Sequence, residues 1–174
     1  MMITLGPGIT LHPGSFTAVV APEGMLAAAL TGSPDLRKFL ILFVSSGPGL
    51  AARVGDLFPY GEALTVSSAA RLPAILHNSR HSILLVGHDP ALFEGAGEAA
   101  GPIAGALRAA ALTALVILYA PSRDPWFDAL ARSADRLVEF IPACGPAGRR
   151  PPAASPAYGS GTALSPEQTR LEVS

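Results

Sequence analysis

Two adjacent polar residues, His88 and Asp89, follow the apolar run Ile83 to Val86 and a single glycine. Imidazole titrates near neutral pH and a carboxylate accepts protons or binds cations, so the pair could perform acid–base or ligand-binding chemistry. The apolar run is typical of a buried strand, and ligands of open α/β sheets bind beyond the carboxyl ends of strands. The sequence therefore makes both residues candidate ligand-binding groups. The alternative is that Asp89 only caps the turn that begins at Pro90.

A second candidate site is the glycine-rich segment Ser45-Ser46-Gly47-Pro48-Gly49, which follows another apolar run. A corner of this kind between a strand and a helix exposes backbone amides that can bind an anion. A glycine turn required only for chain geometry explains the segment equally well. Arg123 follows a later apolar run and is a candidate at the same sheet edge. Nearby Trp126 is expected either to pack at the start of a helix or to contact a partner.

Metal binding is not predicted. The residues that could ligate a metal are Cys144 and four histidines, His12, His77, His81 and His88. None of them forms a C-x-x-C pair, and His77 and His81, although four residues apart, span a predicted helix end. A single cysteine also excludes an intrachain disulfide. Polar residues at the ends of secondary-structure elements are the simpler interpretation.

The elements that must position these residues alternate between apolar strands and helices. Strands are predicted at 15–21, 38–46, 63–69, 81–89, 113–121 and 135–142, and helices at 23–30, 48–58, 70–79, 101–112 and 125–134. Several of the strands are apolar on both alternating faces, as in a parallel sheet that helices cover on both sides. The pattern predicts an α/β fold with a doubly wound, mostly parallel sheet and helices on both faces.

Composition limits the classes of partner. Residues 1–144 are expected to form one domain, and residues 145–174, which are rich in Pro, Gly, Ser and Ala, a flexible tail. The formal net charge of −1 gives no long-range attraction to nucleic acid or to anionic lipid. The chain shows neither a secretory signal nor an apolar span of membrane length, so no membrane contact and a cytoplasmic location are expected.

The order of these features resembles the RecA-like P-loop ATPases, most closely the branch of KaiC-like proteins and archaeal recombinase paralogues. In that family a Pro-Gly-Ser turn leads into the first core strand, as at 13–15, and the phosphate loop often opens with Pro-Glu, as in Pro22-Glu23-Gly24. A later apolar strand ends in a magnesium-associated acid, which 83–93 resembles. The closing helix, Ala-Asp and apolar strand are matched at 127–140. The resemblance covers residues 9–142 and implies a RecA-like core, with Pro22, Glu23 and Gly24 as candidate ligand-binding residues.

The nucleotide chemistry of that family is missing. A phosphate loop has the form G-x-x-x-x-G-K-[ST], in which lysine neutralises phosphate charge and the hydroxyl binds Mg²⁺. After Gly24 this chain continues with Met-Leu-Ala-Ala, and its only lysine, Lys38, is expected at the start of the next strand. Asp89 also stands two residues later than the family's acid, a displacement of roughly 6–7 Å along an extended chain. The chain is therefore predicted to be a degenerate member with no catalytic residue and no ATP or magnesium cofactor.

Residues Val86 to Pro90 also resemble the Val-Gly-His-Asn-Pro segment of histidine phosphatases. That family requires Arg-His-Gly at the end of its first strand, where this chain has Val-Val-Ala-Pro-Glu-Gly. Because a short motif without its context is weak, this resemblance implies no activity.

Two functions from different classes follow. The first is a non-catalytic RecA-like or KaiC-like protein that acts as a regulator, paralogue or scaffold, in DNA repair or signalling, by contacting a RecA-like ATPase or another copy of itself. The second is a small-molecule or nucleotide-binding α/β enzyme that uses the strand ends at Ser45–Gly49, His88–Asp89 and Pro121–Asp124. A nucleic-acid role is a third alternative, suggested by the family's recombination members and opposed by the charge.

Overall fold

The computed structural model describes residues 3–4, 10–47, 56–93, 99–142 and 172–173. The chain divides into two compact units, residues 1–139 and 140–174. Within the second unit, β9 (Ile141–Pro142) pairs in parallel with β10 (Glu172–Val173). The predicted domain boundary, after residue 144, lies five residues beyond this division. The predicted tail, 145–174, otherwise lies outside the described residues.

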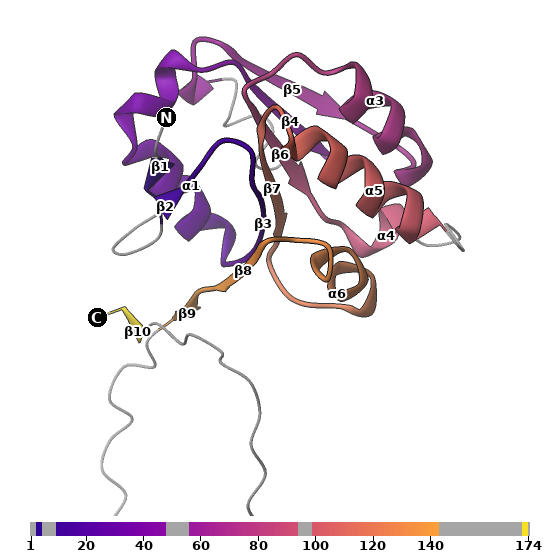
Figure 1. Cartoon of the computed structure of the whole chain (residues 1–174). Helices are drawn as coiled ribbons and strands as arrows, with labels where there is room; N and C mark the ends of the chain where they lie inside the picture. Colours follow the sequence, from indigo (N-terminus) through magenta and orange to yellow (C-terminus); the bar gives the residue numbers. More distant parts are fainter. Residues whose placement is uncertain (1–2, 5–9, 48–55, 94–98, 143–171, 174) are drawn as a thin grey trace, which may run out of the picture. The chain divides into compact units, whose positions relative to one another are not determined.

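The first unit contains a six-stranded sheet in the order β5-β4-β6-β7-β3-β8, and every neighbouring pair of strands is parallel (Figure 1). Its strands are β3 (Phe16–Val20), β4 (Ile41–Ser45), β5 (Gly61–Thr65), β6 (Ile83–Gly87), β7 (Leu115–Ala120) and β8 (Arg136–Glu139). A separate antiparallel pair joins β1 (Ile3–Thr4) to β2 (Thr10–Leu11). The predicted α/β class with a parallel sheet is confirmed.

Helices cover both faces of this sheet, which explains why its central strands are apolar on both sides. The α-helices are α1 (Glu23–Thr31), α3 (Leu72–Asn78), α4 (Pro90–Phe93), α5 (Ala100–Ala111) and α6 (Pro125–Ala131), and the 3₁₀ helices are η1 (Pro34–Lys38) and η2 (Ala69–Arg71). Figure 1 shows α3, α5 and α6 on one side and α1 on the other. In the described part of the chain, no helix combines the length and the apolar character needed to cross a bilayer.

The core has two layers that follow the alternation of the strands. On the α5 side, Leu107 packs in one cluster with Leu84 and Val116, and all three are buried. On the α1 side, Leu30 and Ile117 line the same small cavity. Since alternate residues of a strand point to opposite faces, both layers are filled by the same short apolar runs. The sheet is thereby held rigidly enough to fix the groups at its strand ends.

The structure corrects the expected boundaries at β5 and at the start of β4, and leaves one expected helix largely undescribed. The strand expected at 63–69 is β5 at 61–65, because Ser68 accepts a hydrogen bond from the amide of Ala70 and begins η2. Lys38 lies in η1 and not in the next strand, and its Nζ pairs with Asp35 of the same 3₁₀ helix at 2.8 Å. The helix expected at 48–58 falls largely outside the described residues, and so does Gly49.

Candidate functional site at the strand carboxyl ends

The strand order creates two places where connections leave neighbouring strands in opposite directions. From β3 the chain winds to β4 and β5, then reverses through β6 and β7 to β8. The connections that follow β4 and β6 therefore run apart, toward β5 and toward β7, whereas those that follow β7 and β3 run past each other, toward β8 and toward β4. Crevices at such switch points are where open α/β sheets bind ligands. The candidate residues Glu23, Ser45, Ser46, His88 and Asp89 lie at the carboxyl ends of these strands.

At the β3 corner the helix begins directly against the strand. The amide of Ala21 donates to the carbonyl of Ala120 at 3.1 Å, and α1 begins at Glu23. The amides of Met25 and Leu26 both donate to the carbonyl of Pro22, at 2.9 and 3.2 Å. Only two residues separate β3 from α1, so no loop is left to surround a phosphate. The acid in the first turn, Glu23, also supplies the negative charge that a helix N-terminus favours.

At the β4/β6 crevice the protein's own side chains bind each other. The hydroxyl of Ser46 donates to Oδ2 of Asp89, and Oδ1 of Asp89 accepts from the amide of Ala91 at 3.0 Å. The hydroxyl of Ser45 donates to the carbonyl of Gly47 at 2.7 Å. Asp89 thus caps the turn into α4, which was the alternative to a chemical role. The structure brings two of the candidate residues, Ser46 and Asp89, together across the crevice.

His88 is buried and bound to Asp124, which precedes α6. Its Nε2 lies 2.6 Å from Oδ2 of Asp124, and its imidazole side chain is 1% exposed. Oδ1 of Asp124 accepts from the amides of Trp126 and Phe127 at 2.8 and 2.9 Å, which caps α6. The imidazole also packs against Phe93, with ring centroids 4.7 Å apart. One carboxylate therefore fixes both a helix start and a buried histidine.

Charge and burial shift two pKa values at this edge. Burial raises the pKa of Asp124, but hydrogen bonds from Phe127, His88 and Trp126 and the attraction of His88 outweigh it, so its pKa lies below the usual value. Burial, and then the negative charge of Glu23, raise the pKa of the Tyr119 phenol. Within the described residues, the Tyr119 hydroxyl and Nδ1 of His88 are buried without a hydrogen-bond partner.

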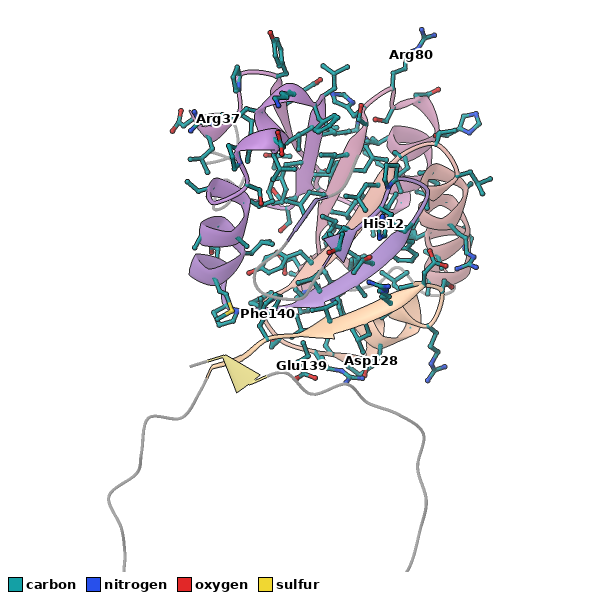
Figure 2. All side chains as sticks on the ribbon, turned by 60° about the vertical axis from the view of Figure 1, so that its left-hand side comes forward. His12, Arg37, Arg80, Asp128, Glu139 and Phe140 are labelled. Carbon is teal, nitrogen blue, oxygen red and sulfur yellow. The ribbon has the colours of Figure 1, made fainter. Side chains whose placement is uncertain are left out.

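Arg123 contacts acids on α6 and at the end of β8, and does not contact the groups at the ends of β4 and β6. Its Nε donates to Asp128 at 2.9 Å, and its Nη1 lies 3.9 Å from Glu139. Figure 2 shows Asp128 and Glu139 close to each other at the β8 edge. Because both acids hold the guanidinium there, Arg123 ties α6 to β8. The prediction that Arg123 belongs with the other candidate ligand-binding residues is not supported by this geometry.

The sequence missed the pairing of His88 with Asp124. A signal was present, because Asp124 stands before Pro125 at a helix start and both residues follow neighbouring strands. The packing of Trp126 against Phe93, with ring centroids 5.8 Å apart, favours the structural alternative for the tryptophan. Among the described residues, no three His, Cys, Asp or Glu side chains gather closely enough to hold a metal ion. No protein-family model matches the chain, and no curated protein matches it by sequence.

Proposed function

We propose that this chain is a RecA-like domain of the KaiC-like and recombinase-paralogue branch that does not use ATP and acts by contacting another protein. The observation that carries the proposal is the corner at Pro22, where α1 begins without a phosphate loop. The order of strands and helices along the chain supports the resemblance. In this role the protein is a cytoplasmic regulator, paralogue or scaffold, and its partner is a RecA-like ATPase or a second copy of itself.

The charges at the carboxyl edge support the loss of phosphate binding. Glu23, Asp89 and Asp124 bring carboxylates to this edge, and the guanidinium of Arg123 is held by Asp128 and Glu139. Lys38 lies in η1, which precedes β4 and therefore lies toward the opposite, amino end of that strand. A polyphosphate would meet carboxylates where a P-loop ATPase presents a lysine and glycine amides.

Thermal melting with and without Mg·ATP tests the proposal. A ligand at 100 times its dissociation constant adds about 2.7 kcal/mol to stability, which would raise the melting temperature by several degrees. We expect no rise and no phosphate release. Mixing the chain with a RecA-like ATPase, followed by light scattering on a sizing column, should show a complex or a self-assembled form. A rise in melting temperature with Mg·ATP would contradict the proposal. So would a chain that stays monomeric and does not bind the RecA-like ATPase.

The unpaired polar atoms of His88 and Tyr119 favour a second candidate, a small-molecule or nucleotide-binding enzyme at the strand carboxyl ends. A buried donor or acceptor without a partner costs about 1–3 kcal/mol, and a ligand that supplied the missing hydrogen bond would recover part of it. A thermal-shift screen with nucleotides and phosphorylated metabolites separates the two candidates. A hit that Tyr119→Phe weakens would favour the enzyme, while a screen without hits would leave it unsupported.

A further inference from the structure

Three side chains near the amino ends of β5 and β6 contact one another in series, away from the site described above. The hydroxyl of Ser79 lies 2.9 Å from Nδ1 of His81, and Nε2 of His81 lies 3.2 Å from Oε2 of Glu62. Ser79 directly follows α3, His81 lies two residues before β6, and Glu62 is in β5. The imidazole is 18% exposed and the carboxylate 66% exposed. A hydroxyl, an imidazole and a carboxylate are thus connected in series.

The donors and acceptors of these groups indicate in which direction a proton passes between them. An ionised carboxylate only accepts, so the Glu62 contact favours a proton on Nε2 of His81 in the neutral imidazole. Nδ1 then has a free lone pair and accepts the hydroxyl proton of Ser79. Arg80, between them in sequence, is exposed and points outward (Figure 2). The order of nucleophile, base and orienting acid is the one that activates serine in hydrolases on unrelated folds, with the two ring nitrogens exchanged relative to that template.

Two cavities open on this chain of side chains. One, of about 490 Å³, lies along α3 and α5 and is lined in part by Leu84, Ala106 and Ala110. The other is a shallow hollow of about 520 Å³ that is largely open to solvent and is lined in part by Leu64 and Ile75. Both are also lined by Ser79 and His81. Their volumes lie within the range of about 300–1,000 Å³ that is usual for small-molecule sites. An apolar acyl group and its alcohol could therefore lie on either side of the serine hydroxyl.

We propose that Ser79 is the nucleophile of a hydrolytic site for short-chain carboxylic esters, with His81 as general base and Glu62 as a positioning residue. This activity is independent of the proposed loss of ATP chemistry, because it uses the other edge of the sheet. Oγ of Ser79 bonds to the ester carbonyl carbon as its proton passes to Nδ1 of His81. The bond from that carbon to the alcohol oxygen then breaks, and His81 returns the proton to the departing alcohol.

Water completes the cycle. It attacks the acyl-serine carbon and gives one proton to Nδ1 of His81, and the bond to Oγ breaks as that proton returns to Ser79. The carboxylic acid leaves, and neither an oxidant nor a cofactor is required. The nearby amides are already engaged, since that of Ser79 donates to Leu76 and that of His81 to the Ser79 hydroxyl. The rate gain is therefore limited to general-base assistance, about 10²–10⁴-fold, and an activated ester is the suitable probe.

The full chain is tested with p-nitrophenyl acetate and with a fluorophosphonate label. Ser79→Ala should lower kcat/KM by at least about tenfold, whereas the matched control Ser82→Ala should change it by less than about twofold. Glu62→Gln should lower kcat severalfold and leave KM and the melting temperature unchanged. A purely structural role of the carboxylate would not produce that split.

Peptide mapping places the label without any variant. Cleavage after arginine isolates residues 72–80, in which Ser79 is the single serine, from the following peptide that contains Ser82. We expect the fluorophosphonate on the 72–80 peptide of the wild-type protein. A folded wild type that takes up no label, label on another peptide only, or a folded Ser79→Ala variant with the wild-type rate would each overturn the proposal. If Ser79→Ala does not fold, the position of the label on the wild type decides.

Discussion

Removing the carboxylate of Asp124 should destabilise the domain through two separable effects. Asp124→Ala deletes the cap of α6, and an N-cap of this type contributes about 1 kcal/mol. It also deletes the 2.6 Å hydrogen bond to the buried His88. A hydrogen bond to a charged group is worth about 1.5–3 kcal/mol, and the 20% exposure of the Asp124 side chain places it toward the lower end. The expected loss in the free energy of unfolding is about 3 kcal/mol.

Asp124→Asn separates the two effects. Asparagine caps helices about as well as aspartate, so only the charged bond to His88 is weakened, and the loss should be about 1–1.5 kcal/mol. Urea denaturation followed by fluorescence is well suited to the measurement, because Trp126, the only tryptophan of the chain, lies two residues from the substitution. Asp128→Asn is the matched control on the same helix. Its partly exposed pair with Arg123 should contribute less than about 1 kcal/mol.

The pH dependence gives an independent check with a defined sign. The pKa of Asp124 is lower in the folded chain than its ordinary value of 3.8, so its carboxylate stabilises the fold at pH values above 3.8. That contribution is lost as the pH falls below 3.8 and through the lower folded-state pKa. The stability difference between wild type and Asp124→Asn should therefore be constant from pH 7 to about 5 and shrink below pH 4. A loss under about 0.5 kcal/mol for Asp124→Ala at pH 7, or a gap that widens in acid, would refute the reasoning.

Two further matched pairs test the fold. Gly14 has a φ of 76°, so Gly14→Ala should lower the free energy of unfolding by about 1 kcal/mol or more. Gly24 lies in α1 with nothing near an added methyl group, so Gly24→Ala should raise the free energy of unfolding by about 0.5 kcal/mol. Urea denaturation measures both, and a Gly24→Ala variant less stable than Gly14→Ala would contradict these backbone conformations. Leu107→Ala removes a fully buried side chain and should lower the free energy of unfolding by about 2–5 kcal/mol. The matched variant Leu112→Ala changes a side chain that is 80% exposed and should change the free energy of unfolding by less than about 0.5 kcal/mol. Thermal melts compare the two, and equal losses would contradict the core described above.

The sequence predicted the strands and the parallel sheet well because the apolar pattern of each short run indicates a strand that is buried on both faces. Runs such as Phe39 to Val44 are apolar on both faces, and only a sheet covered on both sides buries them. Element ends were predicted less well, since a single side chain decided them. Ser68 stops β5 early by starting η2, and that bond depends on a local geometry that periodicity does not contain.

The candidate site was predictable only where its residues followed strands. Ser46 and Asp89 were both identified because each stands at a strand end, and the sheet brings them into contact. Asp124 was not identified as the partner of His88, because it lies 36 residues away and the pairing depends on β6 and β7 being neighbours in the sheet. The contacts of Arg123 were not predicted for a related reason, because the acids on α6 and β8 that bind its side chain come together only in the fold.

The two edges of the sheet differ in the surface that they offer to another molecule: polar side chains already paired with one another at the carboxyl edge, and exposed apolar side chains at the amino edge. At the carboxyl edge, Ser46 is bound to Asp89 and His88 to Asp124, so a ligand that replaced these contacts would have to displace internal hydrogen bonds, and only Nδ1 of His88 and the Tyr119 hydroxyl are buried there without a partner among the described residues. Three of the four exposed large apolar side chains in the described residues, Leu40, Tyr60 and Leu112, precede strands and lie toward the amino edge. Displacing a buried charged hydrogen bond costs about 1.5–3 kcal/mol, whereas covering exposed apolar surface is favourable. A doubly wound fold would ordinarily direct the search for function to the carboxyl edge, but in this protein the energetics favour the amino edge.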